Sequence, residues 1–230
     1  LDLAIIPQYF HWIRGLVTWD LGISYVTEMP VVDELAPRIP ITAKLATLAL
    51  GFSILFGLPL GVISAVKQDT ILDYIVRVIS LSGLSLPSFW LALLILMFFV
   101  NTFGTIPIYL EPPENLWDEL LIYSVPAAAV GFRSSSLIMR LTRSSILEVI
   151  RQDYIRTAHA KGVSSNAVHY HHALRNAMLP LTTIIGLETV FMMGGLVVIE
   201  TVFNIPGMAY FLVEAIEVRD YPIVRNLVML

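Results

Sequence analysis

Histidine clusters and acidic residues are the first places to look in this sequence for metal binding or catalysis. Four of the five histidines lie between His159 and His172, yet no two have the i, i+4 spacing that presents two ligands on one helix face. Cysteine is absent, as are the G-x-x-x-x-G-K-[ST] loop, H-E-x-x-H and G-x-S-x-G. We therefore expect no catalytic residue, metal site or bound cofactor on this chain, and interpret the histidines as solvated.

Two charged residues, Arg133 and Glu188, stand in otherwise apolar stretches. A charge near the centre of a bilayer costs about 2.5–3.5 kcal/mol, so it usually faces a partner or a wet cavity. Both lie roughly 12–14 Å from the same side of the membrane if each helix rises about 1.5 Å per residue. They are predicted to pair or to flank a translocation path with Met192. Alternatively, Arg133 extends to the membrane surface or bonds to a nearby serine or carbonyl, and Met192 only packs.

The composition indicates which elements must position these residues. Of 230 residues, 57% are hydrophobic and 14% charged, and the mean hydropathy is +0.77. A soluble domain has roughly 45–50% apolar and about 25% charged residues. The net charge of -4 also argues against a nucleic-acid partner. We therefore expect an all-α bundle of helices that crosses a lipid bilayer several times.

Uncharged or nearly uncharged stretches locate these helices, because a span needs about 20 apolar residues. The last apolar run has only ten residues, too few for a span, and the first residue is Leu1 rather than Met. We therefore expect the chain to be truncated at both ends. Spans are predicted at 45–66, 79–101, 120–141 and 179–199, with the start of a last span at 220–230.

Orientation follows from the positive residues. Seven of the 14 Lys and Arg residues lie between Arg133 and Arg175, whereas the loop 103–118 has none. We therefore place the loop 140–178 in the cytoplasm and the loop 103–118 outside. Alternation then gives an external interfacial segment at 1–40, a transmembrane domain at 41–230, a cytoplasmic turn at 67–77, a cytoplasmic loop at 142–178 and an external segment at 200–219.

The loop 142–178 has its own pattern. Ile146, Val149, Ile150, Tyr154 and Ala158 recur at intervals of three and four, which predicts one amphipathic helix face.

Glycine, serine and proline then mark helix boundaries in the same loop. Gly162 is expected to stop the first helix, Ser164 or Ser165 to cap a second, and Pro180 to stand in the first turn of the next span. We expect a helix, a turn and a second helix beneath the membrane.

Several motifs in one order resemble those of the permease subunits of binding-protein-dependent ABC importers. They fit the MetI-like fold and its EAA loop, closest to the dipeptide, oligopeptide and nickel branch. The resemblance covers nearly the whole chain. The motifs are D-L-G-x-S-Y at 20–25, L-P-S-F-W at 86–90, R-x-T-R-S-S-x-L-E-V at 140–149, Q-D-Y-I-R-T-A-x-A-K-G at 152–162, H-A-L-R-N-A-x-L-P at 172–180, E-T-V-F-x-x-P-G at 200–207 and R-D-Y-P at 219–222.

The resemblance implies a role for the loop. In such permeases it forms a coupling helix that sits in a groove of a cytoplasmic ATPase subunit and transmits its closure to the spans. The sequence departs from the general motif at Arg156, which replaces a Glu. The residues matched to this loop are Tyr154, Arg156, Thr157, Ala158, Ala160, Lys161, Gly162 and Val163.

The same resemblance implies an assembly in the plasma (inner) membrane of a prokaryote. The expected partners are a second homologous permease, two ATPase subunits that bind ATP and Mg, and an external solute-binding protein. The solute is left open between dipeptide, oligopeptide, nickel, glutathione and oligosaccharide.

The alternative is a secondary transporter or channel that works without ATPase subunits. That class favours internal repeats and broken helices, and we see no convincing repeat. Co-purification of ATPase subunits separates the two hypotheses. A membrane enzyme is disfavoured because the catalytic motifs are absent.

Overall fold

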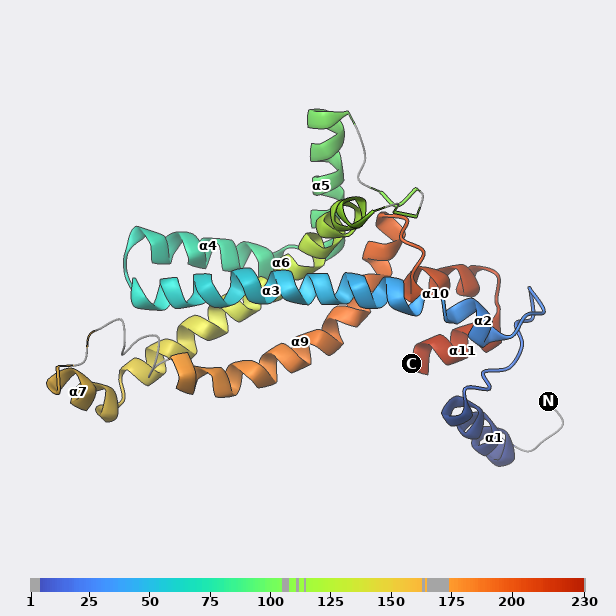
Figure 1. Ribbon diagram of the computed structural model, residues 1–230, viewed down its shortest axis with the longest axis horizontal. Coiled ribbons are helices and arrows are strands. Elements are labelled where there is room, and N and C mark those ends of the chain that lie inside the picture. Colours follow the sequence, from blue (N-terminus) through green and yellow to red (C-terminus); the bar gives the residue numbers. More distant parts are fainter. Residues whose placement is uncertain are drawn as a thin grey trace.

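The computed structural model describes residues 5–104, 108–110, 112–113, 115–162, 164 and 174–229 (Figure 1). Within these residues the chain forms helices and turns, with one isolated antiparallel bridge between Ile23 and Pro30. The helices are α1 (Ile5–Thr18), α2 (Val31–Leu35), α3 (Ile39–Val66), α4 (Ile71–Ser85), α5 (Ser88–Phe103), α6 (Leu116–Ile150), α7 (Asp153–Ala160), α9 (Leu174–Val202), α10 (Met208–Glu217) and α11 (Tyr221–Met229).

Among the residues that the structure describes, three helices are long and apolar enough to cross a membrane. α3, α6 and α9 have 28, 35 and 29 residues. At about 1.5 Å per residue each is longer than the roughly 30 Å of hydrocarbon in a bilayer. They confirm the spans predicted at 45–66, 120–141 and 179–199, and each extends beyond the predicted limits.

The single span predicted at 79–101 is wrong as one helix. α4 and α5 meet at an angle of 107°, and α5 stands across the direction of α4 (Figure 1). Leu86 and Pro87 between them are both extended, with ψ of 127° and 137°. The cause is local, because the ring of a proline disfavours helical backbone at the residue before it.

The start predicted for the following span also needs correction. α9 begins at Leu174, so Pro180 lies inside the helix rather than in its first turn. The earlier turns are stabilised by packing, because Leu174, Ala177 and Leu181 belong to one apolar cluster with the end of α3. In a membrane helix, neighbouring helices make an internal proline tolerable.

Contacts between small residues bring α3 and α6 together. Gly57 and Gly61 of α3 face α6, and a Cβ atom placed on Gly61 would lie 2.6 Å from Cβ of Thr142. Gly131 of α6 faces α3 in the same way, because a Cβ atom placed on it would lie 2.7 Å from the carbonyl oxygen of Ala49. In lipid no hydrophobic driving force brings helices together, so they associate through close packing, and small residues allow their backbones to approach.

Hydrogen bonds at the two ends establish which connecting segments lie together. The backbone N–H of Tyr109 donates to the carbonyl of Phe203 over 2.9 Å, so the loop 103–118 adjoins the segment after α9. At the other end Arg143 of α6 reaches Asp73 at the start of α4. The pairs of segments predicted to share one side of the membrane therefore lie at the same end of the bundle.

The N-terminal segment packs on the last helices of the chain. Leu21, Val31 and Leu35 are buried against Phe211 and Ile223 of α10 and α11. α1 contacts the same region, because the indole N–H of Trp12 donates a hydrogen bond to the Asn226 side chain over 3.2 Å. The described part of the predicted segment 1–40, from residue 5 on, is therefore a partly helical cap that packs on α10 and α11.

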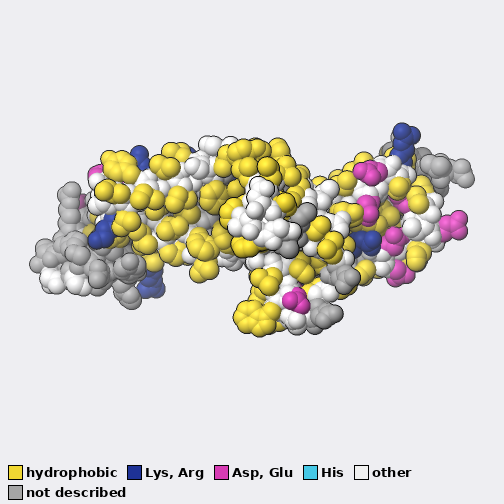
Figure 2. Space-filling model, turned by 90° about the horizontal axis from the view of Figure 1, so that it is seen from above, with side chains coloured by type: hydrophobic (Ala, Val, Ile, Leu, Met, Phe, Trp, Pro, Cys, Tyr) yellow, Lys and Arg dark blue, Asp and Glu magenta, His cyan; other side chains and the backbone are white. Residues whose placement is uncertain are grey.

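The outer surface is largely apolar. Figure 2 shows hydrophobic side chains over the middle of one face, while Asp and Glu gather toward the end that carries α2, α10 and α11. Leu55, Phe98 and Phe191 are among the exposed large side chains. A contiguous apolar surface of this extent is typical of contact with lipid or with another subunit.

The glycine contacts between α3 and α6 give a first prediction. Gly61→Ala should lower the free energy of unfolding by about 1–3 kcal/mol, because its Cβ overlaps α6. Gly51→Ala in the same helix is the matched control, since its Cβ would meet nothing within 4 Å. The control should raise the free energy of unfolding by about 0.5–1 kcal/mol, because Ala favours the helix more than Gly does. SDS titration in mixed micelles measures both, and equal effects would contradict the packing argument.

Candidate coupling and translocation site

α6 ends in a short turn and a second helix that projects from the bundle. It continues without a break to Ile150, nine residues past the predicted span. Arg151 and Gln152 form the turn, and their N–H groups donate to Glu148 and Val149. α7 then runs to Ala160 at one extreme of the molecule (Figure 1).

The predicted helix stop at Gly162 is confirmed. Its φ is +82°, a left-handed conformation that glycine adopts without a steric penalty. The N–H of Lys161 still bonds to the carbonyl of Thr157 over 3.1 Å, so the helical turn closes directly before the glycine.

An apolar cluster seats the lower end of α6. Ile146 is fully buried, and Val149 and Ile150 pack beside it. The cluster joins three helices, because it also contains the last turns of α3 and the first turns of α9. Its buried members are Val62, Ala65, Ile146, Ala177 and Leu181.

The predicted amphipathic face does not continue into α7. Tyr154 is 46% exposed, whereas its neighbour Ile155 is 1% exposed. The turn between α6 and α7 interrupts the helical repeat, so Ile155 rather than Tyr154 faces inward. The Tyr154 hydroxyl instead accepts a hydrogen bond from Nδ2 of Asn176 over 2.8 Å, which ties α7 to the start of α9.

The other residues predicted for ATPase contact lie on or just after α7. Thr157 is exposed, and its hydroxyl donates to the carbonyl of Asp153 over 3.0 Å; Lys161 and Gly162 are exposed too. The contact role of the whole set stays a prediction. The side chains of Arg156, Ala158 and Ala160, all of Val163, and the second helix expected after Ser164 or Ser165 lie outside the described residues.

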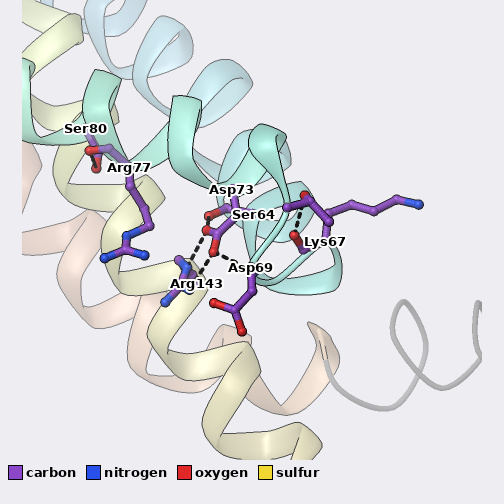
Figure 3. Close-up of polar contacts among 8 residues, drawn as sticks. Ser64, Lys67, Asp69, Asp73, Arg77, Ser80 and Arg143 are labelled. Carbon is purple, nitrogen blue, oxygen red and sulfur yellow. Dashed lines mark hydrogen bonds and ion pairs between the residues drawn. The ribbon is translucent and has the colours of Figure 1, made fainter.

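A buried ion pair lies close to this cluster (Figure 3). Asp73 is 0% exposed, and its two carboxylate oxygens accept from Nε and Nη2 of Arg143 over 2.8 and 2.9 Å. The hydroxyl of Ser64 donates to the same carboxylate over 2.5 Å, and the backbone N–H of Asp69 over 3.1 Å. One carboxylate thus receives four hydrogen bonds.

These four donors come from α3, from the turn after it and from α6. Ser64 belongs to α3, Asp69 to the turn after it, and Arg143 to α6. Breaking a buried pair is costly because the remaining charge has no partner, so the position of α6 against α3 and α4 is fixed here. In the sequence Arg143 is one of the positive residues that indicate the orientation and belongs to the motif at 140–149, but no local pattern marks Asp73 as its partner.

The pairing predicted between Arg133 and Glu188 is wrong. Glu188 is buried, and its Oε2 accepts from the hydroxyl of Ser134 over 2.6 Å. Arg133 is exposed, and no ion pair joins these two described residues. Adjacent residues on a helix point about 100° apart, so when Ser134 faces Glu188 its neighbour Arg133 turns outward.

Met192 also differs from the prediction that it lines a path. It is buried in the core with Leu45, Ala49 and Tyr123, which favours the packing alternative. A different face of α9 is open: a Cβ atom on Gly194 would meet nothing within 4 Å, and the same holds for Gly186 and Gly195.

The E-T-V-F-x-x-P-G motif has a structural explanation at the opposite end. Glu200 is fully buried, and its carboxylate accepts from Thr42 Oγ1 over 2.6 Å and from the backbone N–H of Tyr210 over 2.8 Å. Gly207 lies against the same carboxylate, where no side chain would fit. The motif therefore closes the turn between α9 and α10, a role the sequence signalled only through its pattern.

The described residues form an all-helical bundle with three helices long and apolar enough to cross a membrane, as in a polytopic membrane protein. Residues 57–229 match the family described as "Binding-protein-dependent transport system inner membrane component". The chain belongs to this family, which confirms the resemblance found in the sequence, and it is an inner-membrane transport permease.

Individual relatives are similar over nearly the whole chain. The glutathione transport system permease protein GsiC of Escherichia coli O6:H1 is 37% identical over all of this chain and 73% of its own length. The dipeptide transport system permease protein DppB of Alkalihalophilus pseudofirmus is 36% identical over 95% of this chain and 72% of its own length. DppB of Escherichia coli K12 is 36% identical over all of this chain and 75% of its own length.

The ion pair gives a second prediction. Arg143→Met should lower the free energy of unfolding by about 3–5 kcal/mol, because Asp73 is left buried without its cation. The double variant Asp73→Leu/Arg143→Met should recover most of this loss. Asp69→Asn is the control for a nearby charge, since the backbone N–H of Asp69 hydrogen-bonds to the pair while its carboxylate acts on Arg143 only through space. SDS titration measures all three, and a loss in the control as large as in Arg143→Met would contradict the assignment.

Proposed function

We propose that this chain is the translocation subunit of an ABC importer for peptides or peptide-like solutes. ATP and Mg are bound and consumed on separate cytoplasmic subunits, and an external binding protein delivers the solute. The observation that carries the proposal is the continuous 35-residue α6, which connects the external end of the bundle to α7. A rigid helix of this length transmits a push on α7 across the membrane.

The nature of the solute rests on the relatives. Two bear the name of dipeptide transport permeases and one that of a glutathione transport permease, and glutathione is itself a small peptide. Nickel and oligosaccharides, which the sequence left open, have no support among these names.

Contacts around α7 support its role as the part gripped by an ATPase subunit. Ile155 is buried, and the bond between Tyr154 and Asn176 ties α7 to the start of α9. Lys161 and Gly162 are exposed at its far end. A partner that moves α7 therefore moves α6 and α9 together, since both are fixed to it.

A second permease subunit accounts for the exposed groups of α6 and α9. Arg133 is exposed in the middle of an apolar span, where a charge normally faces a partner or water. The open glycine face of α9 offers a surface for close helix contact. We propose that these two features face the second permease and the path between the subunits.

The left-handed turn after α7 gives a test of ATPase coupling. Gly162→Val should reduce the ATPase subunit that co-purifies with the complex about 5- to 30-fold, because a left-handed β-branched residue costs roughly 1–2 kcal/mol. Gly104→Val is the matched control, since Gly104 has φ of +68° and a Cβ there also meets nothing within 4 Å. It should leave ATPase retention unchanged. Equal retention in both variants, or solute uptake by the chain without nucleotide, would favour the secondary transporter.

The proposed solute class is tested on the external binding protein encoded with this permease. Added dipeptides or glutathione should raise its melting temperature in a thermal-shift assay, because a ligand that binds only the folded state stabilises it. Nickel and oligosaccharides should not. Stabilisation by nickel or a sugar alone would reject peptides as the solute while leaving the importer assignment intact.

A further inference from the structure

A basic cavity lies between α4 and α6, beside the buried ion pair and apart from α7. Its volume is about 270 Å³. Three arginines line it, together with three serines and apolar side chains of α4 and α6. The polar residues are Ser64 of α3 and Arg77, Ser80, Arg140, Arg143 and Ser144. Figure 3 shows Arg77 extending from α4 toward the helix that carries Arg143.

Two of the three positive charges are not compensated. Arg143 is neutralised by Asp73, whose oxygens are fully used by four donors. Arg77 and Arg140 are exposed, and within the described part of the chain neither has an acidic partner at ion-pair distance. Arg77 contacts only the ring of Tyr74, with its guanidinium carbon 5.5 Å from the ring centre. The cavity therefore favours an anion.

Next to the cavity the surface of α4 is apolar. Val78 and Leu81 are 63% and 56% exposed, and Leu81 also lines the cavity. A ligand that fits both parts has an anionic head and a hydrocarbon tail. The site also lies at the end of the bundle predicted to be cytoplasmic, where anionic lipid headgroups meet basic pockets between helices.

We propose that this cavity binds the phosphodiester of an anionic glycerophospholipid. Arg77 and Arg140 hold the phosphate, Ser80 and Ser144 provide hydroxyl groups beside it, and the acyl chains lie along Val78 and Leu81. The lipid links α4 to α6 next to the ion pair, on the surface of the bundle that α9 does not cover. This proposal does not depend on which solute is transported.

Native mass spectrometry of the assembled complex tests the proposal. The complex is stripped of lipid and titrated with phosphatidylglycerol or with zwitterionic phosphatidylcholine of the same chain length. Phosphatidylglycerol should remain bound at lower concentrations. Arg77→Gln/Arg140→Gln should weaken its binding about fivefold for each arginine removed. Arg151→Gln, which removes an exposed arginine just beyond α6, is the matched control and should bind as the wild type does.

Two further measurements keep the test decisive. Arg77→Lys/Arg140→Lys keeps the charge and should retain most of the binding, which separates electrostatics from a packing defect. The proposal is overturned if the wild type binds both lipids equally or if the glutamine variant binds phosphatidylglycerol as strongly as the wild type. Displacement by soluble glycerol phosphate at similar concentrations would also overturn it, because the site would then take a free anion.

Discussion

The buried carboxylate of Asp73 is the constraint on which one end of this permease depends. An ionised group with no exposed surface requires its full set of donors, and these come from α3, the following turn and α6. Satisfying them fixes three helices at once. The apolar cluster around Ile146 lies within a turn of Arg143 and adds α9. Together these contacts make a rigid base from which α7 projects.

The other end is closed by carboxylates that form no ion pair with any residue the structure describes. Glu200 binds a threonine hydroxyl and a backbone N–H, and Asp220 accepts from Ser24 Oγ over 2.5 Å and from the N–H of Val26 over 3.3 Å. Between the two ends, glycine contacts hold α3 against α6. Polar networks at both ends and close packing in the middle favour movement of these helices as one body.

The rigidity of these helices fits the function of the binding-protein-dependent transport family to which the chain belongs. An importer that alternates between two open states needs helices that carry a displacement from one side of the membrane to the other. α6 meets that need, since it reaches from the external loop to α7 without a break. The surfaces left open, on α9 and around Arg133, are those on which further subunits are proposed to act.

The sequence by itself determined the class of protein, the three long spans, the helix stop at Gly162 and the order of the motifs, because hydropathy, glycine and motif text are local properties. Tertiary structure decided the rest. Which way Arg133 and Glu188 point, why Ile155 rather than Tyr154 is buried, and that Asp73 meets Arg143 across 70 residues all depend on helix rotation and on packing between distant segments. The proline before α5, which breaks the helix, is visible in the sequence, whereas the 107° angle between α4 and α5 is known only from the structure.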